Sequence, residues 1–199
     1  MSARKNNIAR KPSFISGRAT LQTIAILPPL PKSFKCELAR SDEQVKMMNY
    51  VDGDKKRFEQ VNKTGQLEIE IYRRDLSLIW ELYPHAKTYF QSKLDLRKPV
   101  VNPDTFYDWK EEGFKMINKR KCQKFVGREP ESRWPYDDAR EICFVDVQTG
   151  MRRRAITFNP AGTQCLTVDW LNAEVGSQPN AVFEIPPNFK RVYRRYYDA

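Results

Sequence analysis

The sequence predicts an α+β fold with an extended basic arm at the N-terminus and an amphipathic helix at the C-terminus. Three observations predict it. Apolar residues recur at helical spacing between about residues 41 and 120, and they alternate in the manner of strands between about 141 and 185. The residues of 186–199 return to helical spacing. We therefore divide the chain into an arm (1–36), an α+β body (37–185) and the terminal helix.

The arm holds most of the excess positive charge. It contains seven Lys and Arg residues and no acidic residue, whereas the remainder has 28 basic and 25 acidic residues, a net charge of only +3. This composition resembles that of a mitochondrial transit peptide. Residues 27–31, with three prolines in four positions, predict a stiff spacer before the body. The candidate partner-binding residues of the arm are Arg4, Lys5, Arg10, Lys11 and Arg18.

Helix-start signals and apolar spacing predict the helical part of the body, about residues 41–120. The Ser-Asp-Glu-Gln of 41–44 has the pattern of a capping box. Residues 67–83 form a helical stripe, although their first five residues also alternate as a short strand would. The Asn-Pro-Asp of 102–104 is a strong helix start, and we expect that helix to end near Lys119.

An antiparallel β-meander is expected in the C-terminal half, about residues 141–185. The predicted strands are 141–147, 151–158, 163–171 and 181–185. Gln148, Thr149 and Gly150 have the length and the terminal glycine of a hairpin turn. Because side chains alternate along a strand, Arg152 and Arg154 should share one face and contact a partner there.

The C-terminus is the most regularly patterned segment. Its apolar residues fall at i, i+3, i+4, i+7 and i+8 from Phe189, and its arginines occupy the other face. Such a helix can dock on its own sheet, on a partner, or on an anionic lipid or RNA surface. The candidate partner-binding residues of this helix are Phe189, Tyr193, Arg194, Arg195 and Tyr196.

No pattern in the sequence nominates a reaction. His85 is the only imidazole, and no phosphate-binding loop or metalloprotease motif occurs. The spacings of Cys36, Cys122, Cys143 and Cys165 match no zinc framework, so we expect reduced, mostly buried thiols. We therefore expect no catalytic residue, no metal and no cofactor. No apolar run is long enough for a membrane-spanning helix.

These features predict a non-catalytic structural (accessory) subunit of a large multiprotein assembly, such as a mitochondrial energy-transducing membrane complex. Protein–protein contacts should dominate, because a protein that coats nucleic acid usually has a basic body. The first alternative is a mitochondrial-type ribosomal protein that binds rRNA through its arm. An enzyme that uses carboxylates is a distant alternative. Anionic lipid headgroups stay open as a further partner, and a cytoplasmic location is the alternative to a mitochondrial one.

Overall fold

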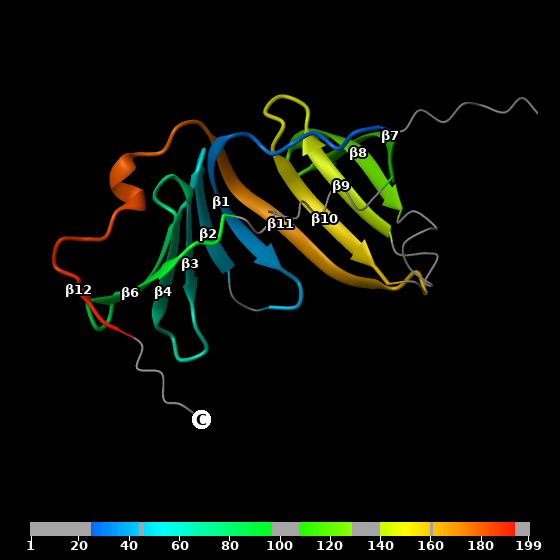
Figure 1. Cartoon of the computed structure of the whole chain (residues 1–199). Helices are drawn as coiled ribbons and strands as arrows, with labels where there is room; N and C mark the ends of the chain where they lie inside the picture. Colours follow the sequence, from blue (N-terminus) through cyan, green and yellow to red (C-terminus); the bar gives the residue numbers. More distant parts are fainter. Residues whose placement is uncertain (1–24, 44–45, 97–107, 129–139, 160, 194–199) are drawn as a thin grey trace, which may run out of the picture.

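The computed structural model describes residues 25–43, 46–96, 108–128, 140–159 and 161–193 (Figure 1). Within them, 12 strands form one sheet in the order β12-β6-β5-β4-β3-β2-β1-β11-β10-β9-β8-β7. The strands are β1 (Ser33–Arg40), β2 (Lys46–Asp52), β3 (Lys55–Val61), β4 (Leu67–Arg73), β5 (Leu78–Tyr83), β6 (Thr88–Lys93), β7 (Asp108–Ile117), β8 (Arg120–Arg128), β9 (Arg140–Asp146), β10 (Arg152–Phe158), β11 (Gln164–Val175) and β12 (Lys190–Arg191).

Two antiparallel meanders make up this sheet. Strands β1 to β6 follow one another in space, as do β7 to β11, and the pairing of β1 with β11 joins the two meanders. Figure 1 shows the two halves turned relative to each other about this central pair. The short β12 is the exception, because it pairs in parallel with β6. The end of the described chain therefore joins the sheet beside β6, about a hundred residues earlier in the sequence.

The predicted helical half is wrong, because its described residues form β2 to β7 and one short 3-10 helix, η1 (Arg74–Leu76). Alternation dominates over the helical spacing. Ile69 and Ile71 are buried on one face, and Trp80 and Leu82 of the next strand meet them there. Two alternating strands joined by a short turn place apolar residues about as densely as a helical stripe does, which explains the misreading.

The signals for helix ends have other roles in the structure. The Ser41 hydroxyl, expected as an N-cap, instead accepts a hydrogen bond from the backbone N–H of Thr167 on β11 at 2.9 Å. Asn118 and Lys119 have φ values of 47° and 63° and form the two-residue turn between β7 and β8. The expected start at 102–104 lies outside the described residues.

The C-terminal part keeps three of the four expected strands, as β9, β10 and β11. The fourth, 181–185, is wrong, since this segment contains the 3-10 helix η3 (Asn180–Phe183). The predicted amphipathic helix is also wrong over its described part, which forms extended chain and β12. Prolines 186 and 187 offer no backbone N–H and favour extended structure, so they work against a helix at this point.

Both faces of the sheet carry buried clusters, and on each face a segment near one end of the described chain packs over one of them. On one face, residues 25–31 pack over the right-hand half in Figure 1, where buried Leu27 contacts Trp109 and Phe125. On the opposite face, the C-terminal segment packs over β3 to β6. We call residues 179–191, which contain η3 and β12, the strap. β1 begins at Ser33, so the sheet starts within the segment that we assigned to the arm.

Candidate functional site

The strap is fixed to the sheet by one aromatic side chain. Phe183 is fully buried, and its ring lies in a cluster with Ile71, Trp80 and Leu82. Ile185 and Phe189 pack against the same cluster from farther along the strap. Burying an aromatic side chain of this size contributes about 1.5–3 kcal/mol by transfer arithmetic, so Phe183 is the main apolar anchor.

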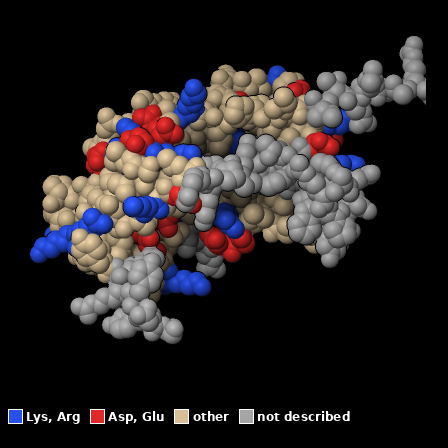
Figure 2. Space-filling view, viewed as in Figure 1, with Lys and Arg blue, Asp and Glu red and all other residues tan. Residues whose placement is uncertain are grey.

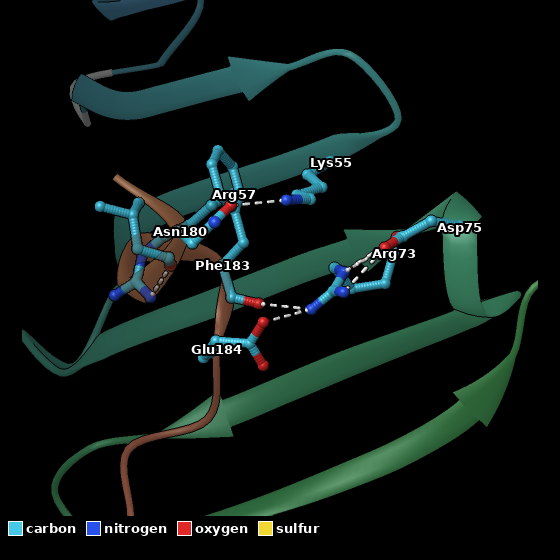
Figure 3. A network of polar contacts seen from close by, with 8 residues as sticks. Lys55, Arg57, Arg73, Asp75, Asn180, Phe183 and Glu184 are labelled. Atoms are coloured by element: carbon cyan, nitrogen blue, oxygen red, sulfur yellow. Dashed lines mark hydrogen bonds and ion pairs between the residues drawn. The ribbon is translucent and has the colours of Figure 1, made fainter. Parts of the chain in front are cut away.

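Charged side chains from β3 and β4 hold backbone and side-chain oxygens of the strap (Figure 3). The Arg57 guanidinium donates to the Val182 carbonyl at 2.8 Å, and the Lys55 ammonium donates to the Asn180 side-chain oxygen at 2.7 Å. Arg73 Nη1 donates to Glu184 Oε1 at 2.6 Å. These contacts satisfy polar groups of a segment that has few regular backbone hydrogen bonds.

Arg73 links the strap to the turn after β4. Its Nε and Nη2 donate to the Asp75 carboxylate at 2.9 and 2.7 Å, while its Nη1 points to the strap. The hydrogen bond from Arg73 holds the pKa of the Asp75 carboxyl below its ordinary value. The Arg73 guanidinium also lies 5.7 Å from the centre of the Trp80 ring. One side chain therefore couples the apolar cluster, the turn and the strap.

The far end of the strap is paired to the edge of the sheet. The backbone N–H of Lys190 donates to the Lys87 carbonyl at 2.9 Å, and that of Val192 donates to the Tyr89 carbonyl at 2.9 Å. A strand of only two residues gives little pairing, so the strap is held mainly by Phe183 and the polar contacts.

A groove of about 520 Å³ lies between the strap and the sheet. Its lining residues are Tyr50, Arg57, Glu59, Ala181, Val182, Glu184, Ile185, Pro186 and Pro187. We call it the strap groove. One wall is the largely apolar strap, and the sheet side presents the Tyr50 ring beside an ion pair between Arg57 and Glu59 at 2.6 Å. Burial, with a smaller effect from Glu59, raises the pKa of the Tyr50 hydroxyl, which therefore stays protonated.

The lining of the strap groove is suited to holding a ligand with one apolar and one polar end. Its lining contains no Ser, Cys or His, and its Glu59 carboxylate is already engaged by Arg57. Over the described residues, no group of three His, Cys, Asp or Glu side chains could hold a metal ion. The apolar walls can hold a hydrocarbon chain, while the Tyr50 hydroxyl and the ion pair can meet a polar end.

A smaller groove of about 280 Å³ lies on the opposite face, between residues 30–32 and strands β1 to β3. Phe34, Val51 and Phe58 line it, together with Asn49. The Asn49 side-chain oxygen is buried and has no hydrogen-bond partner within the described part of the chain. Because that oxygen is closed to water, it is also closed to a ligand, and this groove is the weaker candidate.

Three of the four thiols are buried in the core. Cys36, Cys122 and Cys143 are buried, Cys165 is exposed and all four are free, which confirms that the thiols are mostly buried. Burial raises the pKa of the Cys36 thiol to about 12. A thiol of this kind carries almost no thiolate at neutral pH and is a poor nucleophile.

Most of the candidate residues from the sequence lie away from the strap groove or outside the described residues. Arg154 makes a two-pronged ion pair with Asp169 of β11 at 2.6 and 3.0 Å, and Arg152 is buried beside a register shift in the strand pairing. Phe189 packs on the buried cluster around Phe183, and Tyr193 is 74% exposed. Residues outside the described chain are Arg4, Lys5, Arg10, Lys11, Arg18, Arg194, Arg195 and Tyr196.

Sequence reasoning missed the residues that line the strap groove and hold the strap. Tyr50, Arg57 and Arg73 are separated by turns, and their common face becomes visible only when the strands are read in register. Strict alternation through β2 to β5 was the available signal. No local signal indicated that Phe183, more than a hundred residues later, would cover this face.

Comparison with known proteins finds a likeness in fold but none in sequence. Neither a protein-family model nor a curated protein sequence matches the chain. An uncharacterized conserved protein from Thermus thermophilus matches with a TM-score of 0.57 at 12% identity, covering 83% of this chain and 92% of that one. The shared fold is established by this structure.

Two weaker matches are to named bacterial proteins. The Mycobacterium tuberculosis lipoprotein LppX matches with a TM-score of 0.45 at 11% identity, covering 74% of this chain and 90% of that one. A Pseudomonas aeruginosa MucA/MucB complex matches with a TM-score of 0.43 at 9% identity, covering 78% of this chain and 56% of that one. These values describe a distant likeness only.

The predicted mitochondrial accessory subunit is wrong, and so are its ribosomal alternative and the mitochondrial location. That interpretation rested on the basic arm, the near-neutral body and the lack of catalytic motifs. The described body has instead the β fold that it shares with the Thermus thermophilus protein. Lys and Arg side chains are interspersed with Asp and Glu on the described surface in view (Figure 2), unlike an RNA-coating surface. Within the described residues, no helix is long and apolar enough to cross a membrane.

Proposed function

We propose that this chain is a non-catalytic binding protein whose strap groove holds an amphiphile with an acyl-like hydrocarbon chain. The observation that carries the proposal is the groove itself, which has about 520 Å³ of space between an apolar strap and a sheet. This volume is in the range of small-molecule sites, which are typically lined by apolar side chains with a few polar groups.

The arrangement of polar groups supports an amphiphile over a purely apolar ligand. The hydrocarbon chain would lie along Val182, Ile185 and the two prolines, and its polar end would meet Tyr50 and the Arg57–Glu59 pair. Burial of hydrocarbon supplies about 0.8 kcal/mol per methylene group, so chain length should control affinity.

The strap offers a route of entry. The Glu184 side chain that contacts Arg73 is 53% exposed, so the ion pair is screened by water and is weak. β12 adds only two paired residues. We propose that the part of the strap after Phe183 lifts when these contacts separate, which admits and releases the ligand, while Phe183 and the sheet beneath it stay in place.

A fluorescent fatty acid tests this function. We expect the full chain to bind it saturably, and to bind long chains more tightly than short ones. Ile185→Trp should fill the groove and weaken binding by about tenfold or more, the equivalent of about 1.4 kcal/mol. Ile26→Trp is the matched control, because Ile26 is exposed and its neighbour Ala25 pairs with Trp109 in the other half of the sheet. Equal binding by both variants, or none by the wild type, would refute the proposal.

A further inference from the structure

Three large apolar side chains are exposed at one end of the half-sheet that the strap does not cover. Phe114 is 60% exposed, Met116 61% and Val147 53%. Phe114 and Met116 are two residues apart on β7 and share a face. Met116 pairs with Lys121 of β8, and the backbone N–H of Val147 donates to the Lys121 carbonyl at 3.1 Å. The three side chains therefore lie on one face of the sheet, with Lys121 between Met116 and Val147, and we call them the patch.

Positive charge lies on both faces of the hairpin that carries this patch. Lys121 shares the face of Phe114 and Met116, whereas the Lys115 ammonium lies on the opposite face, 5.8 Å from the centre of the Phe144 ring. Residues 113–124 contain five basic side chains and no acidic one. The basic side chains are Lys115, Lys119, Arg120, Lys121 and Lys124. Two nearby carboxylates are already engaged, since Glu112 pairs with Lys124 at 2.7 Å and buried Asp146 pairs with Arg153 at 2.8 Å. Glu111, farther from the turn on β7, makes no ion pair within the described residues. Among the described residues, no ion pair neutralises the other four.

The hairpin presents these groups on a firm support. The two-residue turn at Asn118 and Lys119 has both φ values positive, which matches the twist of the paired strands. Ile117 and Cys122, on either side of the turn, are buried. The Lys121 ammonium lies 4.4 Å from the centre of the Phe114 ring, so charge and aromatic surface are adjacent.

We propose that this hairpin tip, made by Phe114, Met116, Val147 and the basic residues 119–121, docks on an anionic lipid surface. The apolar side chains would enter the headgroup region while the cations contact lipid phosphates. A headgroup layer can satisfy all of these cations at once, and it requires no acidic residue placed at a fixed position. The tip lies in the other half of the sheet from the strap groove, so the proposal does not depend on the groove's ligand.

Vesicle co-sedimentation of the full chain tests this assignment. The vesicles are phosphatidylcholine alone and phosphatidylcholine mixed with phosphatidylglycerol, each at low and at physiological ionic strength. We expect binding to the anionic vesicles that weakens with salt. Lys119→Gln with Lys121→Gln should weaken binding by about thirtyfold, at about a tenfold effect per 1.4 kcal/mol and about 1 kcal/mol per cation. Phe114→Ser with Met116→Ser should weaken it at both ionic strengths.

Matched controls separate the tip from other basic parts of the chain. Lys63→Gln with Lys93→Gln removes two exposed lysines elsewhere, and Leu76→Ser with Val175→Ser removes two exposed apolar side chains elsewhere. Val147→Ser is a third, independent test of the patch. Equal binding by the tip variants, the controls and the wild type would assign the effect to the basic arm and overturn the proposal. Absence of vesicle binding by the wild type would overturn it as well, leaving a protein as the occupant of the tip.

Discussion

In the half of the sheet under the strap, Arg73 reaches a carboxylate that is 53% exposed, whereas in the other half Arg153 reaches one that is 1% exposed. Arg153 donates to the Asp146 carboxylate from Nε at 3.1 Å and from Nη2 at 2.8 Å. A partly exposed pair can separate at small cost, because water replaces the lost contact. A buried pair cannot, because separation leaves a charge without water.

This difference indicates that the two halves have different tasks. The strap side combines one apolar anchor with ion pairs that can exchange with water, which suits a cover that opens. The other half fixes its turn between β9 and β10 through Asp146, whose carboxylate also accepts the backbone N–H of Gln148 at 2.9 Å. That rigid turn supports the β8–β9 end at which the exposed hairpin tip is presented.

The largest expected effect is on the anchor of the strap. Phe183→Ala should lower the free energy of unfolding by about 3–5 kcal/mol, because it leaves a cavity beside Ile71 and Trp80. It should also abolish binding of the fluorescent fatty acid. Urea unfolding and the same titration measure the two effects. A variant that keeps its affinity would show that the strap is not a wall of the binding site.

In the other half, Asp146→Asn should lower the free energy of unfolding by about 3 kcal/mol. Arg153 then stays buried without a full counter-charge. Fatty-acid binding by the folded fraction should be unchanged. If binding falls in parallel with stability, the two halves are not independent and the comparison fails.

The pH dependence of stability isolates the same carboxylate. Burial alone would raise the pKa of Asp146, but hydrogen bonds from Arg153 and the backbone outweigh it, and the pKa is lowered. A lowered folded-state pKa stabilises the protein above the unfolded value of about 3.9, and this contribution is lost as pH falls through the folded pKa. Stability curves measured from neutral to acid pH should therefore decline less steeply in Asp146→Asn than in the wild type. Parallel curves would contradict this assignment.

The smallest effect on stability is expected from Glu184→Gln. Arg73 keeps its bond to Asp75, so the free energy of unfolding should change by less than about 1 kcal/mol. Release of the fatty acid should become faster, because the strap loses its exposed ion pair. Stopped-flow displacement measures the rate, and Glu112→Gln, whose carboxylate pairs with Lys124 in the other half of the sheet, is the control. Unchanged release in Glu184→Gln would argue against entry beneath the strap.

The sequence predicts structure best where the information is local. Strands β9 to β11 follow from alternation and from the turns at Gly150 and Gly162, both of which have positive φ. The N-terminal strands were not predicted, because the apolar residues of short strands with brief turns also fit helical spacing. The pairing of β1 with β11 joins residues more than a hundred positions apart, so no local pattern reveals it. The strap groove likewise depends on contacts between residues 181–187 and strands more than a hundred positions earlier, so it was not predictable.

Hydrogen exchange of the full chain with and without a saturating long-chain fatty acid tests the central claim most directly. The account predicts slower exchange in the strap, at the backbone N–H groups of Val182, Phe189 and Lys190, which donate to Pro179, Pro186 and Lys87. It predicts no change in β7 to β9. Unchanged exchange in the strap, or protection centred on β7 to β9, would contradict a ligand held between the strap and the sheet.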